Sequence, residues 1–93
     1  MKIQVRFFAS LREALGSVEE VDLPEGSTLG DLRDHLLARG GRYQEALARG
    51  RAVRGALNHV LVDESTVIEA DDEADADADA NPEVAFFPPV TGG

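Results

Sequence analysis

An acidic, low-complexity run limits most strongly what this chain can fold into. Residues 69–83 hold eight Asp and Glu residues in fifteen positions, mostly alternating with Ala. Such a run has too little apolar surface to offset the entropy lost on ordering. We therefore predict a mobile loop over residues 70–82, inserted before the last strand of a single domain at residues 1–90. Residues 91–93 are predicted to form a flexible tail.

The run also carries most of the net charge. The 93-residue chain has 18 Asp and Glu residues and 9 Lys and Arg residues, which gives a net charge of -9. Outside the run the chain has ten acidic and nine basic residues, so this part is nearly neutral. An acidic balance argues against nucleic acid and anionic membranes as partners, although a nearly neutral body weakens that argument. The chain shows neither a signal peptide nor an apolar stretch of about 20 residues, so a cytoplasmic location is expected.

Two strands are predicted at the N-terminus. Residues 2–7 alternate polar and apolar side chains with the period of a half-buried strand, and residues 18–23 do the same. The Pro-Glu-Gly sequence at 24–26 ends the second strand in a turn. Between the strands, Ser10 and Glu13 have the spacing of a capping box, which predicts a brief helical turn.

One main helix is predicted in the first half of the chain. It begins at Ser27 or Thr28, since either side chain can serve as the N-cap. Gly40-Gly41 supplies its C-terminal stop, and residues 42–55 follow with a mixed pattern that includes a short helical stretch near residues 43–48. The helix has one apolar stripe with i, i+3, i+7, i+8 spacing, formed by Leu29, Leu32, Leu36 and Leu37.

The second half of the chain predicts further strands. Residues 56–62, which include Asn58 and His59, read as one strand, and after a turn residues 67–68 form a brief partner. Residues 84–87 return to strand character, and two prolines end that strand because neither can donate to a ladder.

This order of elements predicts an α+β fold, with a mixed sheet of four to five strands packed on one main helix. So few helical residues can cover only one face of the sheet. Apolar surface near Phe86, Phe87 and Val90 is therefore expected to stay available for a partner.

The side chains supply no standard catalytic or metal centre. The absence of cysteine excludes disulfides, thiolate zinc sites and any thiol nucleophile or persulfide on a side chain. His35 and His59 lie far apart in sequence with no patterned acids beside them, and no phosphate-binding loop or nucleophile elbow occurs. We expect no resident metal and no bound cofactor.

The acidic run also contains a candidate cation site. Asp75, Asp77 and Asp79 have the spacing that opens a calcium loop. Ala80 then stands where the turn glycine belongs, and Phe86 where the bidentate glutamate belongs. A solvated loop is the preferred interpretation, with weak divalent binding and an acidic interaction module as alternatives.

The strongest physical signal for chemistry is the C-terminal pair Gly92-Gly93. Without Cβ atoms, these residues can pass a narrow channel and present an unhindered carboxylate to another protein's active site. Pro88 and Pro89 stiffen the exit in an extended form. The carboxylate is inert until activated, so an enzyme and ATP would have to convert it to an acyl-adenylate.

Both ends of the chain carry motifs of a known family. Residues 7–13 read Phe-Phe-Ala-Ser-Leu-Arg-Glu, and residues 83–93 read Glu-Val-Ala-Phe-Phe-Pro-Pro-Val-Thr-Gly-Gly. With the helix start at residues 28–32 and Asn58, they resemble the small subunit of molybdopterin synthase, a ubiquitin-like β-grasp sulfur carrier. The resemblance covers most of the chain apart from the acidic run and residues 42–55.

The resemblance implies a non-catalytic, sulfur-donating subunit. An adenylyltransferase would use ATP to adenylate the Gly93 carboxylate, and a sulfurtransferase would convert it to a thiocarboxylate. The tail would then enter the large synthase subunit, with Gly92 passing the channel, and donate sulfur to the pterin precursor. Phe7 and Leu11 would belong to the core. The residues at or near the partner interface would be Phe86, Phe87, Pro88, Pro89 and Val90.

The same architecture resembles archaeal small modifier proteins. There the activated terminal glycine forms an isopeptide bond with a lysine of a target protein, so both roles share the adenylation step and do not exclude each other. The acidic run stands where the sulfur carriers commonly have a tight turn, which suggests a salt-adapted, archaeal lineage. Lys2 is the only lysine, so chains of such a modifier would run through Lys2 or the N-terminal amine.

Overall fold

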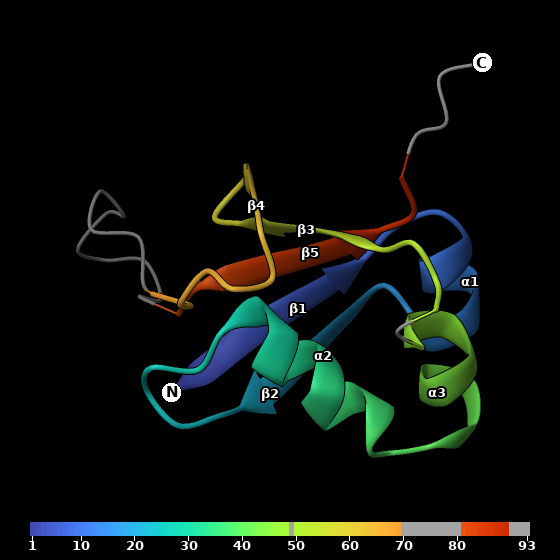
Figure 1. Cartoon of the computed structure of the whole chain (residues 1–93), viewed down its shortest axis with the longest axis horizontal. Helices are drawn as coiled ribbons and strands as arrows, with labels where there is room; N and C mark the ends of the chain where they lie inside the picture. The colour runs from blue at the N-terminus through green and yellow to red at the C-terminus, as the bar shows by residue number, and fades with distance from the viewer. Residues whose placement is uncertain (49, 70–80, 90–93) are drawn as a thin grey trace.

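The last strand of the sequence lies in the middle of a five-stranded mixed sheet (Figure 1). The computed structural model describes residues 1–48, 50–69 and 81–89. Helices cover one face of the sheet. The elements are β1 (Lys2–Phe7), α1 (Ser10–Leu15), β2 (Val18–Asp22), α2 (Leu29–Leu37), α3 (Gly41–Leu47), β3 (Arg54–Leu57), β4 (Val60–Val62) and β5 (Glu83–Phe87). The structure thus confirms the predicted α+β class and its mixed sheet on one main helix.

The strand order is β2-β1-β5-β3-β4. β5 pairs parallel with β1, where Phe86 lies opposite Phe7, and antiparallel with β3, where Phe87 lies opposite Arg54. The two outer pairs, β1 with β2 and β3 with β4, are antiparallel. The C-terminal strand is therefore hydrogen-bonded on both sides, and the chain leaves the sheet from the central strand.

The core lies between the sheet and the helices. Phe7 of β1 and Phe86 of β5 are each 1% exposed, and their rings stack with centroids 6.4 Å apart. Leu11 of α1 is 5% exposed, so the prediction that Phe7 and Leu11 belong to the core is confirmed. The other buried apolar residues are Ile3, Val5, Val21, Leu23, Leu29, Leu32, Leu36, Leu47, Ile68 and Val84.

The main helix α2 begins after Thr28, one of the two predicted N-caps. The Thr28 hydroxyl accepts from the Asp31 backbone N–H at 3.1 Å, and the Asp31 carboxylate accepts from the Thr28 N–H at 2.9 Å. This reciprocal pair is a capping box, which satisfies two N–H groups at the helix start. Along the predicted apolar stripe Leu37 is only half-buried, whereas Arg33 is buried.

The C-terminal end of α2 is tied to the edge strand β2. Arg39 forms an ion pair with Glu19, and the Tyr43 hydroxyl donates to the same carboxylate at 2.9 Å. The hydrogen bond that Arg39 donates to Glu19 raises the pKa of Arg39 above its ordinary value, because the carboxylate stabilises the charged guanidinium. Helix α3 follows, close to the helical stretch predicted near residues 43–48.

The prediction of one strand over residues 56–62 is wrong. The segment is a hairpin, in which Leu57 pairs with Val60 across the two-residue turn Asn58-His59. Both turn residues have positive φ, 48° and 73°. Two-residue hairpin loops favour this geometry because its twist matches that of the strands. Asn tolerates positive φ, but the flanking apolar residues on both sides gave the pattern of a single strand.

Two smaller predictions also differ from the structure. Val67 makes only an isolated bridge with Thr28, so residues 67–68 are not a strand, although Ile68 is buried. The capping box predicted from Ser10 and Glu13 does not form, because Ser10 is already inside α1 and Ala9 is its N-cap, with no side-chain cap bond.

Candidate functional site

The candidate site is the end of β5, where the chain leaves the sheet. The Phe8 N–H donates to the Phe86 carbonyl at 3.1 Å, so the parallel ladder with β1 continues to the last residues of the strand. Pro88 and Pro89 follow and are half-buried. Figure 1 shows this end beside α1, at the opposite side of the molecule from the N-terminus. The ladder thus fixes where the C-terminal segment starts.

The structure separates the residues predicted to contact a partner. Phe87, Pro88 and Pro89 are half-buried and keep accessible surface. Phe86 faces the other way and is 1% exposed, which makes it a core residue with almost no surface to offer a partner. This difference follows from the alternation of β5, in which successive side chains point to opposite faces. Val90, Gly92 and Gly93 lie outside the described residues.

The face of the sheet opposite the helices is open and partly apolar. Ala85 of β5 lies opposite Ala56 of β3, and Ala56 lies opposite Leu61 of β4. Residues paired in register point to the same face, so these three side chains form an apolar row beside Phe87. Leu61 is 60% exposed, and Phe8, which follows β1, is 45% exposed. The expected uncovered apolar surface therefore exists and adjoins the tail exit.

A polar cluster borders this apolar row. The Glu83 carboxylate lies 2.5 Å from Arg6 Nε and 3.2 Å from His59 Nε2. These three side chains, together with Phe8 and Ala85, line a shallow depression on the open face. The His59 side chain is largely exposed, so the cluster offers charge and hydrogen bonds to a docking surface and no enclosed reaction site.

Asn58 joins both ends of the segment that holds the acidic run. Its side-chain amide donates to the Glu69 carbonyl at 3.0 Å, and its Oδ1 accepts from the Glu83 backbone N–H at 3.0 Å. Its own N–H donates to the Glu83 carbonyl at 2.8 Å. These hydrogen bonds thus hold Glu69 and Glu83, the two ends of the acidic run, beside the start of β5. Pro82, placed by the prediction in the loop, is buried, and its carbonyl accepts from the Gln4 N–H at 3.0 Å.

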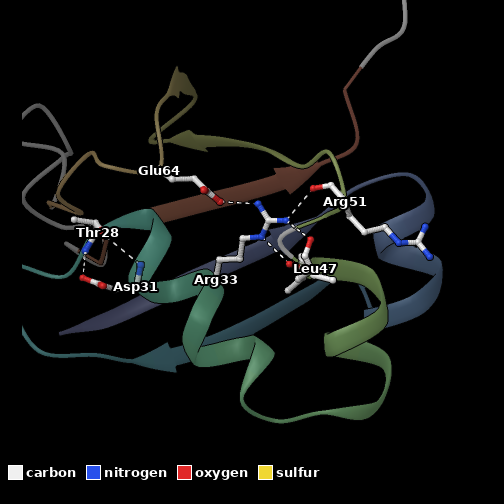
Figure 2. Close-up of polar contacts among 7 residues, drawn as sticks. Thr28, Asp31, Arg33, Leu47, Arg51 and Glu64 are labelled. Atoms are coloured by element: carbon white, nitrogen blue, oxygen red, sulfur yellow. Dashed lines mark hydrogen bonds and ion pairs between the residues drawn. The ribbon is translucent and has the colours of Figure 1, made fainter.

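A buried arginine, which the sequence analysis did not single out, organises the segment after α3 (Figure 2). Arg33 Nε donates to the Leu47 carbonyl at 2.7 Å, and Nη2 donates to the carbonyls of Ala48 at 2.6 Å and Arg51 at 3.0 Å. Nη1 pairs with Glu64 at 2.7 Å. The available signal was its position, four residues after Leu29 on the buried face of α2.

Among residues 1–48, 50–69 and 81–89, no three side chains of His, Asp or Glu gather as metal ligands. His35 is exposed on α2, and His59 lies in the hairpin turn and not in a strand. The carboxylates Asp75, Asp77 and Asp79 lie outside the described residues. No helix in the described part of the chain has the length and apolar character needed to span a bilayer.

The fold and the exit of the chain from its central strand define a ubiquitin-like β-grasp protein. The sequence model of the ThiS family matches residues 5–93, and the chain belongs to this family. It is similar to the molybdopterin synthase sulfur carrier subunit of Escherichia coli K12, with 38% identity over 91 residues that cover 98% of this chain and 99% of the relative.

Solved structures share the fold over its full length. SAMP1 from Haloferax volcanii superposes with a TM-score of 0.69 at 24% identity, covering 100% of both chains. A structure of the protein complex of subunits 1 and 2 of the molybdopterin-converting factor from Helicobacter pylori has a TM-score of 0.60 at 24% identity, again covering 100% of both chains. At this identity the likeness shows the common fold.

Proposed function

We propose that this protein is the sulfur-carrying small subunit of a molybdopterin synthase. The observation that carries the proposal is the near full-length match to a sulfur carrier subunit at 38% identity. The chain ends in Gly92-Gly93, a few residues after the central strand that the sheet holds on both sides. The protein is a carrier and not a catalyst, since its own side chains contribute no nucleophile to the transfer.

The chemistry takes place on the Gly93 carboxylate. An adenylyltransferase joins one carboxylate oxygen to the α-phosphorus of ATP and releases pyrophosphate. Sulfur at the oxidation level of sulfide, supplied by a sulfurtransferase, then attacks the carbonyl carbon, AMP leaves with that oxygen, and the product is a thiocarboxylate. The large synthase subunit takes in the tail, and sulfur passes to the pterin precursor. Gly92 serves this step because a residue without Cβ passes a narrow channel.

The large subunit is the proposed partner of the open sheet face and the tail. The Helicobacter pylori protein of the same fold is known in a complex of two subunits. Phe87, Pro88 and Pro89 connect the apolar row of Ala85, Ala56 and Leu61 to the start of the tail. We assign Val90 to the same contact. The activating adenylyltransferase needs the same end of the molecule, so the two partners compete for it.

The test is the intact mass of the protein purified from its native host. Sulfur carriage predicts a fraction whose mass exceeds that of the unmodified chain by the difference between one sulfur and one oxygen atom. Tandem fragmentation places this difference on Gly93. The fraction should disappear when the host's adenylyltransferase gene is deleted. If the chain carries only oxygen in a host that makes the molybdenum cofactor, the proposal is contradicted.

Protein tagging is the second candidate function. The observation that favours it is the full-length fold likeness to SAMP1, combined with the terminal Gly-Gly that both roles require. In this role a lysine amine attacks the Gly93 adenylate, forms an isopeptide bond and releases AMP. Proteolytic digests of host proteins should then contain lysines that carry a C-terminal remnant of this chain. Consistent absence of the remnant leaves sulfur carriage as the single role. The acidic-module alternative gains no support from the described residues, because most of the run lies outside them.

A further inference from the structure

A groove lies on the helical side of the molecule, directly beside the tail exit. It runs between α1 and α3 and extends to Pro88, the first residue after β5. Apolar side chains line it, among them Leu11, Ala14 and Ala46. Arg42 of α3 and Arg51 of the following loop add two positive charges. The groove is thus distinct from the open sheet face, and the two surfaces meet where the chain leaves the sheet.

The backbone of Arg51 is held by a hydrogen bond from the buried Arg33. Its carbonyl accepts from Nη2 of Arg33, whose buried guanidinium also holds the carbonyls of Leu47 and Ala48. Figure 2 shows the Arg51 side chain extending away from Arg33 and toward α1. The loop backbone is therefore held by a buried network while the guanidinium is exposed. A charge held by a rigid backbone loses less entropy when a partner binds.

Among the described residues, the two arginines of the groove have no ion-pair partner, and the groove's lining carries two positive charges against the one negative charge of Glu45. In contrast, Arg6, Arg33 and Arg39 each pair with a glutamate. Two exposed guanidinium groups above an apolar floor favour a ligand with both carboxylates and apolar side chains.

We propose that this tail-side groove binds an acidic, partly apolar segment of the large synthase subunit, next to the place where that subunit takes in the tail. The inference rests on the proposed function. Pro88 lines the groove and also begins the tail, so a subunit that surrounds the tail covers the groove as well. Charge complementarity at Arg42 and Arg51 would orient the carrier before its tail enters and would accelerate the encounter.

The experiment measures binding of the purified large subunit from the same host to the full-length carrier. The variants are Arg42→Glu, Arg51→Glu and the double variant. Lys2→Glu is the matched control for each single variant, because Lys2 is exposed at the far end of the sheet and each single substitution changes the charge by the same amount. The double variant is expected to raise Kd about tenfold or more, mainly by slowing association, and to reduce the dependence of association rate on salt. Lys2→Glu should stay within about twofold of the wild type.

The possible results distinguish failure of the groove proposal from failure of the proposed function. If Arg42→Glu and Arg51→Glu each bind with the Kd of Lys2→Glu, while the wild type binds tightly, the groove proposal is overturned and sulfur carriage stays intact. A double variant that binds the large subunit normally but is adenylated slowly would assign the groove to the activating enzyme and also overturn it. A wild type that does not bind the large subunit contradicts the proposed function itself. Unchanged urea unfolding midpoints confirm that the variants fold, as expected for exposed side chains.

Discussion

Arg33 and Glu64 form an ion pair that joins α2 to the turn before Ile68, with 2.7 Å between Nη1 and Oε1. The Arg33 side chain is 5% exposed and that of Glu64 is 36% exposed. The Glu64 carbonyl also accepts from the Gly30 N–H at 2.8 Å, so side chain and backbone of Glu64 both contact α2. The buried Arg33 thus connects three segments: α2, the loop after α3 and the turn that contains Glu64.

Replacing Arg33 tests this junction. Arg33→Met fills much of the same volume but leaves the carbonyls of Leu47, Ala48 and Arg51 without their donor. We expect the free energy of unfolding in urea to fall by about 2 to 4 kcal/mol. Glu64→Gln keeps an acceptor oxygen and should cost about 1 kcal/mol. Equal losses for the two variants would contradict the role of Arg33 as a carbonyl donor.

Gly55 of β3 is required by close packing. A Cβ at this position would lie 2.6 Å from Leu29 Cδ2 and 3.6 Å from the Phe86 ring, inside the core. Gly55→Ala is therefore expected to lower the free energy of unfolding by about 1 to 3 kcal/mol. Gly50→Ala is the control, since nothing lies within 4 Å of the added atom. Thermal or urea unfolding measures both, and a neutral Gly55→Ala would show that the core can shift to admit a methyl group.

Alanine substitutions at Thr28 and Ser10 compare a helix cap that forms with a predicted cap that does not form. Thr28→Ala removes the acceptor for the Asp31 N–H and should cost about 1 kcal/mol. Ser10→Ala should change stability by less than about 0.5 kcal/mol, because the Ser10 hydroxyl makes no cap bond at the start of α1. Equilibrium urea unfolding of the two variants provides the comparison. A larger loss of stability for Ser10→Ala than for Thr28→Ala would support the capping box predicted from the sequence.

Deleting Gly93 tests the terminal mechanism. The shortened chain ends in Gly92 and should keep wild-type stability, because both residues follow the last described strand. We expect loss of thiocarboxylate formation and of any conjugation, measured by intact mass and by the lysine remnant. Retention of either activity in a stable, shortened protein would exclude Gly93 as the reacting residue.

Lys2 is the residue that would accept a second copy if the protein tags itself. It is the only lysine, and its side chain is 61% exposed. The N-terminal amine pairs with Asp22 at 3.2 Å, which is closer than the 3.8 Å between Lys2 Nζ and Glu20. Lys2→Arg should therefore abolish most linked species in a gel of conjugates, while an acetylated N-terminus alone should not. Linked chains in a protein that carries both changes would require an acceptor other than an amine.

The periodic parts of the sequence predicted the fold well, and the exceptions have physical causes. Ile3 and Val5 alternate with polar residues, and the structure places them in β1 with the predicted orientation. The hairpin at Asn58 was missed because apolar residues flank it and His59 takes a conformation that Gly normally supplies. The strand order β2-β1-β5-β3-β4 was not predicted, because it depends on long-range pairing that no local pattern records.

The candidate site was only partly predictable. The alternation of β5 assigns Phe86 and Phe87 to opposite faces, but only the helices' position decides which face is buried. Arg33 could be placed on the buried face of α2 from its spacing, yet its carbonyl partners come from a segment without a clear pattern. The two arginines of the groove become neighbours of Pro88 only through the packing of α1 against α3.

The parallel pairing of β1 with β5 has a practical consequence. Because both strands run in the same direction, Met1 and Pro89 lie at opposite ends of the sheet (Figure 1). A protein joined genetically to Met1 would therefore emerge at the end of the sheet opposite to Pro89. A fluorescent protein, a surface tether or an affinity tag can therefore be attached there, at the loss of one exposed ion pair with Asp22 and without blocking the end of the sheet that Pro89 leaves.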